Sequence, residues 1–206
     1  MNQELLEEIK RLKSIADLGL LYCDNEYNKE RYTELLEISF RLLSKVSGQD
    51  IAIFKENFPV AKDYPTAKVD IRGMVLSPEK KILLVKERAD NKWSLPGGWA
   101  DIGYSPKEVI VKEFKEETGL DVIPETLLAV FDKRMHAHPA QPLYIYKVAF
   151  YCKAISSQSD IGFDILDINY FDINNLPELS ETRILKSQIE LLYKKVIESD
   201  WKTYFD

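Results

Sequence analysis

Residues 97–120 have the sequence GGWADIGYSPKEVIVKEFKEETGL, in which a glycine turn precedes a helix with clear boundary signals. Ser105 is suited to the N-cap, Pro106 suits the first helical position, and Glu108 can complete a capping box. Gly119 offers a stop, because glycine readily adopts the left-handed conformation that ends helices. The sequence therefore predicts a capped helix directly after a glycine turn.

Three carboxylates lie close together on this predicted helix. Glu113 and Glu117 are four residues apart and Glu116 is three residues from Glu113, so we expect all three to converge on one patch. Each like-charged neighbour costs roughly 0.2–0.5 kcal/mol on a bare helix. The cluster is thus tolerable as a solvated face, and it becomes favourable when divalent cations neutralise it.

The glycine turn and the glutamates together resemble the signature of the Nudix hydrolases. In that signature a glycine and a glutamate precede an Arg-Glu-hydrophobic-any-Glu-Glu-any-Gly-hydrophobic block, which here reads KEFKEETGL from Lys112 to Leu120. Counting back places the glycine at Gly98 and puts Tyr104 where the lone glutamate belongs. The chain departs from the pattern at two positions, because Tyr104 removes an acid and Lys112 lacks the two-pronged grip of arginine.

The resemblance implies a site for Mg²⁺ or Mn²⁺, with Glu113, Glu116 and Glu117 as catalytic metal ligands and the Gly97 carbonyl as a backbone ligand. It implies hydrolysis of the diphosphate of a nucleoside diphosphate linked to another moiety, such as CDP-choline or ADP-ribose. The products are a nucleoside monophosphate and a phosphorylated remainder. A metal suits this reaction because water must be acidified and phosphate oxygens neutralised. Two alternatives stay open: an exonuclease acting on RNA ends, and a nucleotide-sensing module without catalysis.

Loops around the signature supply further candidate residues. Many Nudix enzymes take a general base from an acidic loop at the place of Asp164 and Asp167, so the resemblance makes both candidates for that role. In a similar bacterial subgroup, which includes CDP-choline and ADP-ribose pyrophosphatases, a loop with Asp, Lys and His flanks the substrate, and residues 132–138 resemble that loop. A zinc site made by the two histidines alone is a weak alternative. The side chains expected to contact substrate are Arg72, Lys86, Arg88, Trp99, Tyr104, Asp132, Lys133, His136 and His138.

Residues 1–48 are predicted to form a helical extension. Apolar residues recur at helical spacing over 3–18 and 27–47, and Gly19 is expected to belong to the connection between the two helices. A helix pair of this length buries little surface alone, so its apolar faces should meet the main domain or another subunit. Similarity to the extension of CDP-choline and ADP-ribose pyrophosphatases implies a homodimer.

Residues 49–67 are predicted to be a linker with at most one turn of helix, because prolines interrupt a polar segment. The remaining residues, 68–206, are expected to form the Nudix hydrolase domain. Strands are predicted at 68–76, 82–85, 127–131, 143–152 and 168–171, and a final helix at about 181–199. This order gives an α/β fold, a Nudix-type α/β/α sandwich in which a mixed sheet lies between helices.

Composition limits the other classes of function. The chain has 206 residues and a formal net charge of −6 at pH 7, which disfavours broad nucleic-acid binding but leaves a local basic groove open. No apolar run of about 18 residues appears, and the start, MNQELLEEIKRLK, is charged where a signal peptide is apolar. We therefore expect a cytoplasmic protein with no membrane segment. Cys23 and Cys152 are too few for a disulfide framework.

Overall fold

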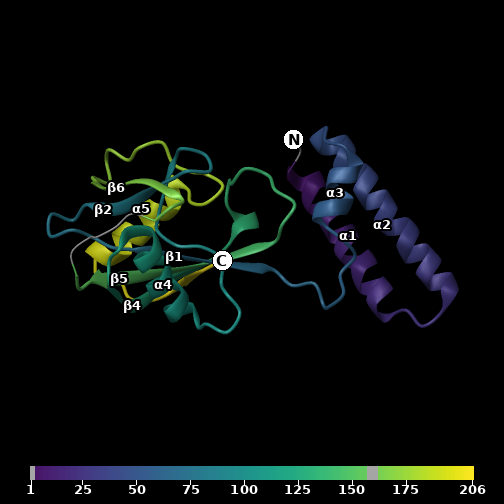
Figure 1. The fold of residues 1–206 in the computed structure, drawn as a ribbon, viewed down its shortest axis with the longest axis horizontal. Coiled ribbons are helices and arrows are strands. Elements are labelled where there is room, and N and C mark those ends of the chain that lie inside the picture. The colour runs from purple at the N-terminus through teal and green to yellow at the C-terminus, as the bar shows by residue number, and fades with distance from the viewer. Residues whose placement is uncertain (1–2, 157–161) are drawn as a thin grey trace. The chain divides into compact units, whose positions relative to one another are not determined.

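The computed structural model describes residues 3–156 and 162–206 and divides into two compact units, labelled by element in Figure 1. The helical unit contains the chain up to Ala67 together with Ala140–Leu143. The sheet unit contains Lys68–Pro139 and Tyr144–Asp206. Across the described ranges, no helix is long and apolar enough to cross a membrane.

The helical unit consists of α1 (Gln3–Tyr22), α2 (Glu26–Ser47) and α3 (Ile51–Asn57). Asn25 caps α2 by accepting from the Asn28 amide, and Gly48 ends that helix in the left-handed conformation, at φ 73°. One apolar stripe from each helix is buried, as amphipathic helices require. The buried core of the unit is Leu6, Ile9, Ala16, Leu36, Phe40, Leu43 and Phe54.

Two details of this unit differ from the sequence-based expectation. Helix α1 continues through Gly19 to Tyr22, so Gly19 is not part of the connection. The Tyr32 ring packs so closely that a Cβ at Gly19 would lie 2.2 Å from it, which explains a glycine inside a helix. Helix α3 has seven residues, longer than the single turn expected, because Phe54 is buried in the helical core.

The sheet unit alternates strands with two α-helices. Its elements are β1 (Lys68–Met74), β2 (Ile82–Glu87), β3 (Trp93–Ser94), α4 (Pro106–Thr118), β4 (Val122–Asp132), η1 (Lys133–Met135), β5 (Ile145–Ala154), β6 (Ile165–Phe171), α5 (Lys186–Ile197) and β7 (Tyr204–Phe205). The expected single mixed sheet is divided in two: a mixed sheet in the order β1-β5-β4-β7, and an antiparallel one in the order β3-β2-β6. Strands β1 and β5 pair in parallel, with Lys68 opposite Ile145.

Side chains that alternate along the strands contribute to two separate hydrophobic cores. Val75 directly follows Met74, the last residue of β1, and the two side chains enter different clusters because successive residues of an extended chain point to opposite faces. Helix α4 covers one cluster with Val109, Ile110 and Phe114. Helix α5 covers the other cluster. The strands thus lie between two helices, which is the α/β/α arrangement that the sequence predicts.

Helix α5 begins at Lys186, five residues later than the predicted start near Glu181. The preceding residues form a turn in which the amides of Arg183 and Ile184 both donate to the Ser180 carbonyl, at 2.7 and 2.9 Å. The Gln188 side chain then accepts from the Leu185 amide at 3.2 Å and stabilises the helix start. The turn carries Arg183 next to Glu87 of β2.

Candidate active site

The glycine turn is hydrogen-bonded to strand β1. The Ile71 amide donates to the Gly98 carbonyl at 2.7 Å, and the Gly73 amide donates to the Pro96 carbonyl at 3.0 Å. Gly97, between them, has φ 134° and lies so close to β1 that a Cβ would stand 2.0 Å from the Ile71 carbonyl oxygen. Glycine is therefore required here both by the backbone conformation and by the available space.

Helix α4 is capped as predicted. Ser105 Oγ accepts from the Glu108 amide at 3.4 Å, and Glu108 Oε2 accepts from the Ser105 amide at 2.7 Å. Gly119 ends the helix in the left-handed conformation, at φ 69°. Because the apolar side of α4 is buried in the core, the helix is fixed in rotation and its glutamates have defined directions.

Two of these glutamates contact the glycine turn. Glu117 is 6% exposed, and its Oε2 accepts from the Gly97 amide at 2.9 Å. Glu113 lies beside the next residue, since a Cβ on Gly98 would meet its Oε1 at 2.7 Å. The structure thus brings together Gly97, Gly98, Glu113 and Glu117, which the sequence pattern had singled out.

Burial raises the pKa of both carboxyl groups. Loss of solvent raises the pKa of Glu117 well above its ordinary value, although the Arg72 charge and the Gly97 hydrogen bond act in the opposite direction. Burial also raises the pKa of Glu113, with the Glu116 charge adding to the effect and Arg72 opposing it. The positive charge of Arg72 therefore does not fully offset the burial of Glu113 and Glu117.

The third glutamate faces a different partner. Glu116 is exposed and lies 3.6 Å from Lys112, whose Nζ bonds Asp101 at 2.8 Å. Lys112 thus pairs with Glu116, one turn along α4, while Glu108 is engaged in the cap. Within residues 3–156 and 162–206 no three Asp, Glu, His or Cys side chains are gathered as a group that could hold a metal ion, so the convergence of the three glutamates on one metal stays a prediction.

Arg72 lies beneath the turn. The sequence placed it at a strand end facing a ligand, whereas the structure buries it to 6% exposure. Its Nε donates to Asp70 Oδ1 at 2.9 Å, and its Nη1 donates to the Leu95 carbonyl at 3.0 Å and to Ser94 Oγ at 3.4 Å. Direct contact of Arg72 with a substrate stays a prediction.

A network of buried charges continues from Arg72 in two directions. Asp70 also accepts from Lys147, which is 2% exposed. On the other side Arg72 Nη1 lies 3.9 Å from Glu87, which pairs with Arg183 Nε at 3.0 Å. Arg183 Nη1 in turn lies 3.1 Å from Asp90 Oδ2.

Most of this network was not predicted from the sequence. Its signal was a charged residue at an inward strand position, such as Lys147 within the apolar run of β5. Asp70 and Arg72, two residues apart on β1, share one face for the same reason of alternation. Paired charges at buried positions could thus have been sought on every predicted strand.

The donor set fits Mg²⁺ or Mn²⁺ by its chemistry. Carboxylate oxygens are hard ligands, and the Gly97 carbonyl accepts no hydrogen bond from the described residues. The connected carboxylates are Asp70, Glu87, Asp90, Glu113 and Glu117, and the connected cations are Arg72, Lys147 and Arg183.

Trp99 and Tyr104 border the turn with exposed rings. Trp99 is 48% exposed with the Lys68 Nζ 5.3 Å from its ring centroid, and it forms a β-bridge with Asp70. Tyr104 is 52% exposed, with the Lys112 Nζ 5.8 Å from its centroid. Both predicted substrate-contacting rings thus lie near signature residues with a cation beside them.

The loop before β6 lies against the end of α4. The Gly162 amide donates to the Glu117 carbonyl at 3.2 Å, and the Asp164 carbonyl accepts from the Arg88 amide at 2.8 Å. Arg88 Nε also donates to the Phe163 carbonyl at 3.0 Å. The structure therefore places Asp164 and Arg88, two of the predicted site residues, next to the helix that carries the glutamates.

Lys86 and Asp167 lie elsewhere on the strands. They are directly opposite each other in the antiparallel pairing of β2 with β6, so their side chains share one face. Asp167 Oδ1 accepts from the neighbouring Ile168 amide at 2.8 Å. Of the two acids predicted as general base, Asp167 is thus occupied locally.

The loop after β4 is bound to the C-terminal part of the chain. Asp132 caps η1 by accepting from the Arg134 amide at 3.0 Å. Lys133 is 6% exposed and donates to the Thr182 carbonyl at 2.5 Å. His136 Nε2 lies 2.9 Å from Asp206 Oδ2. Substrate contact by these side chains stays a prediction, since each has a partner within the sheet unit.

His138 is buried to 3% exposure, and its Nδ1 lies 2.5 Å from the Glu181 carbonyl. Because a carbonyl only accepts, Nδ1 carries the proton in the neutral ring, and Nε2 has no hydrogen-bond partner among the described residues. Burial lowers the pKa of His138 from 6.5 to about 4. His138 is therefore neutral at pH 7.

His138 should make the fold sensitive to acid. The unfolded chain binds this proton below pH 6.5 and the folded chain only near pH 4, so stability falls as pH drops through that window. Between pH 7 and pH 4.5 we expect a loss of about 2.5 kcal/mol from this group. Urea unfolding of the parent and of His138→Gln at both pH values measures it. His136→Gln is the matched control, and an equal pH dependence in the parent and His138→Gln would contradict the assignment.

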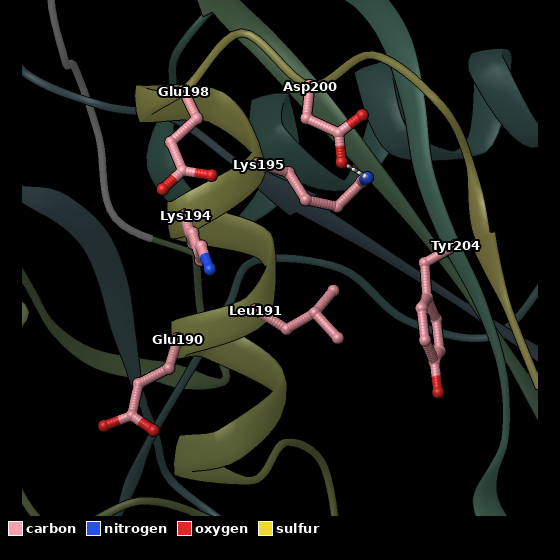
Figure 2. Close-up of a pocket in the computed structure, with 7 residues that line it drawn as sticks. All are labelled: Glu190, Leu191, Lys194, Lys195, Glu198, Asp200 and Tyr204. Carbon is pink, nitrogen blue, oxygen red and sulfur yellow. Dashed lines mark hydrogen bonds and ion pairs between the residues drawn. The ribbon is translucent and has the colours of Figure 1, made fainter.

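A separate surface pocket of about 490 Å³ lies in the sheet unit between α5 and the segment that carries Tyr204 (Figure 2). Lys195 bonds Asp200 at 2.6 Å at its upper edge in this view. Its lining residues are Glu190, Leu191, Lys194, Lys195, Glu198, Asp200 and Tyr204. None of the residues predicted to bind metal or substrate lines this pocket, so the candidate active site is the glycine turn with α4.

Comparison with known proteins covers both units. Residues 3–58 match the UDP-X-like N-terminal oligomerisation domain of Nudix proteins, and residues 67–189 match the NUDIX domain. The chain is 41% identical over 201 residues to a Bacillus subtilis (strain 168) protein named "Putative ADP-ribose pyrophosphatase YjhB", covering 98% of this chain and 96% of that protein. It is 31% identical over 123 residues to the ADP-ribose pyrophosphatase of Methanocaldococcus jannaschii, covering 57% and 68%.

Solved structures agree with this comparison. A UDP-X diphosphatase superposes with a TM-score of 0.64 at 35% identity, covering 98% of both chains. An ADP-ribose pyrophosphatase from Streptococcus suis superposes with a TM-score of 0.62 at 34% identity, covering 68% of this chain and 100% of that one. With its NUDIX domain spanning more than half of its length, this chain belongs to the Nudix hydrolase family.

Proposed function

We propose that this Nudix hydrolase splits, with a divalent metal ion, the diphosphate bond of a nucleoside diphosphate linked to another moiety. The products are a nucleoside monophosphate and a phosphorylated remainder. The observation that carries the proposal is the buried Glu117 carboxylate held 2.9 Å from the Gly97 amide, with Glu113 beside Gly98. The names of the relatives, ADP-ribose pyrophosphatase and UDP-X diphosphatase, support this substrate class.

Glu113, Glu117 and the Gly97 carbonyl would hold Mg²⁺ or Mn²⁺, with Glu116 assisting from the exposed side of α4. When bound, the ion supplies charge neutralisation of phosphate oxygens and acidification of the attacking water. The chain's own contribution is to fix the ligands beforehand, because the turn is bonded to β1 and α4 is packed on the core.

The remaining site residues have distinct tasks. The exposed Trp99 and Tyr104 rings offer flat faces on which a nucleobase stacks, and such stacking tolerates any base. Asp164 belongs to the loop whose Gly162 amide donates to the Glu117 carbonyl, whereas Asp167 accepts from its own neighbour Ile168. Asp164 is therefore the better candidate to accept a proton from water. Arg88, on the same loop contact, is placed to meet the charge of a phosphate.

A substrate panel tests the proposal. We expect specificity constants for CDP-choline, ADP-ribose and a UDP-sugar to exceed those for ATP and CTP by about tenfold or more, because a free triphosphate demands more positive charge than this acidic domain offers. Each compound is assayed with Mg²⁺ and with Mn²⁺, and the products are identified by mass. A triphosphate at the head of the series would overturn the proposed substrate class, and the order among the diphosphate derivatives selects the physiological type.

The two alternative functions give different results in the same panel. A sensing module binds a nucleotide without forming product, whereas an exonuclease releases nucleotides from RNA ends. The match of residues 3–58 to an oligomerisation domain supports an oligomer. That the oligomer is a homodimer stays a prediction, which sedimentation equilibrium of the full chain can check.

A further inference from the structure

Arg72 is surrounded by the backbone that forms the active-site turn. Its chain neighbours Ile71 and Gly73 donate hydrogen bonds to the carbonyls of Gly98 and Pro96. A Cβ on Gly97 would stand 3.0 Å from the Arg72 Cα, so the turn lies directly on this residue. The main chain of β1 thus holds both ends of the turn, and Arg72 lies under its centre.

The Arg72 side chain holds the segment that leads into the same turn. Its Nη1 donates to the Leu95 carbonyl at 3.0 Å and to Ser94 Oγ at 3.4 Å, while its Nε is fixed by Asp70 at 2.9 Å. A guanidinium can make these contacts together because its donors lie in one rigid plane. A lysine in this place has a single donor group and cannot reproduce them.

The cation of the signature, Lys112, has other partners. Lys112 bonds the half-exposed Asp101 at 2.8 Å and lies 3.6 Å from the exposed Glu116. Glu117 is instead oriented by its hydrogen bond with the Gly97 amide, and the residues that precede Gly97 hold that amide in place. The buried positive charge on that side comes from Arg72, which is itself kept in place by Asp70 and Glu87.

We propose that Arg72 is the positioning residue of the active site: it clamps residues 94–97 so that the Gly97 amide meets the Glu117 carboxylate. Arg72 acts through the turn, since its donors are engaged by Asp70, Ser94 and Leu95. The proposal rests on the proposed function only for its catalytic consequence, since the clamp itself is a property of the folded chain.

Arg72→Lys tests the clamp, and Arg183→Lys is its matched control. Both variants make the same chemical change within one charge network, but Arg183 contacts Glu87 and Asp90 and has no contact with the turn among the described residues. In Arg72→Lys we expect the Gly97 amide to exchange with deuterium about tenfold faster, because its hydrogen bond to Glu117 opens more often. In Arg183→Lys the exchange of this amide should stay at the parent rate.

Metal binding and kinetics provide two further readouts. Mn²⁺ affinity, measured from the paramagnetic resonance of free Mn²⁺ without substrate, should weaken about tenfold in Arg72→Lys and stay unchanged in Arg183→Lys. In the substrate assay, kcat should fall while KM changes little, because the ligands of the reacting centre and not the nucleoside contacts are disturbed. Ser94→Ala removes one contact of the clamp and should give a smaller change in the same direction.

The outcomes separate the two proposals. Equal Gly97 exchange in Arg72→Lys and Arg183→Lys overturns the clamp, even if the parent hydrolyses the diphosphate panel. Faster exchange in Arg72→Lys alone supports the clamp, even if the parent hydrolyses nothing and the proposed function fails. If Arg72→Lys does not fold, Ser94→Ala decides by the same measurement, and parent-like exchange in it overturns the clamp.

Discussion

Glu117→Gln is expected to lower turnover by about a hundredfold or more while leaving the fold at least as stable as the parent. The amide oxygen of glutamine can still accept from the Gly97 amide, so the contact at 2.9 Å survives. The charge, however, is lost, and with it the proposed metal ligand. Burial raises the pKa of Glu117, which means that the ionised carboxylate is destabilised in this environment relative to water, so its replacement by a neutral amide costs the fold little.

Steady-state kinetics and thermal unfolding measure the two effects separately. Glu108→Gln is the matched control on the same helix, because its side chain accepts from the Ser105 amide and glutamine can do the same. That variant should keep both turnover and melting temperature. Turnover of Glu117→Gln within about tenfold of the parent would contradict the metal assignment and favour a different role for this carboxylate.

Gly97→Ala should damage both stability and activity. Alanine is strained at φ 134°, and its Cβ would stand 2.0 Å from the Ile71 carbonyl oxygen, a backbone atom that cannot move aside cheaply. We expect a loss of about 3 kcal/mol or more in the free energy of unfolding, because strain and overlap add. The turn must shift to relieve the overlap, so the Gly97 contact with Glu117 breaks and turnover falls.

Gly103→Ala is the matched control for this substitution. Gly103 also has a positive φ, 93°, and lies in the loop between the turn and α4, but nothing lies within 4 Å of its Cβ position. Gly103→Ala should lower the free energy of unfolding only by the cost of backbone strain, roughly 1 kcal/mol, and should preserve turnover. Urea unfolding of the two variants side by side checks this, and equal losses would mean that the close approach of Gly97 to β1 contributes nothing.

Local signals explain why much of the fold could be predicted. The cap at Ser105, the stop at Gly119 and the alternating strands obey rules that span only a few residues. The structure has α4 between these two signals and a strand at each predicted place, although β4 begins five residues before its predicted start and the short strands β3 and β7 were not predicted. The contact of Glu117 with the glycine turn joins residues 20 apart in the chain, so local rules do not predict it, and only the resemblance to the signature assigned both groups to one site.

The interactions that could not be predicted join distant parts of the chain. Lys147 and Asp70 are 77 residues apart, and Arg183 meets Glu87 only because a turn before α5 carries it there. Such pairs follow from strand register and packing, which short-range patterns do not specify. The close approach of Gly19 to Tyr32 is a similar case, since glycine within a helix looks like a stop until its neighbour is known.

The two hydrogen bonds that suspend residues 96–98 from β1 also fix this backbone before any ligand arrives. Ordering one residue costs roughly 1–2 kcal/mol in conformational entropy. For this turn that entropy is already lost when the protein folds, so the loss does not subtract from the affinity for a metal ion or a diphosphate. The rigid turn lets the chain bind small, highly hydrated ligands through a few oxygen atoms without first having to order a loop.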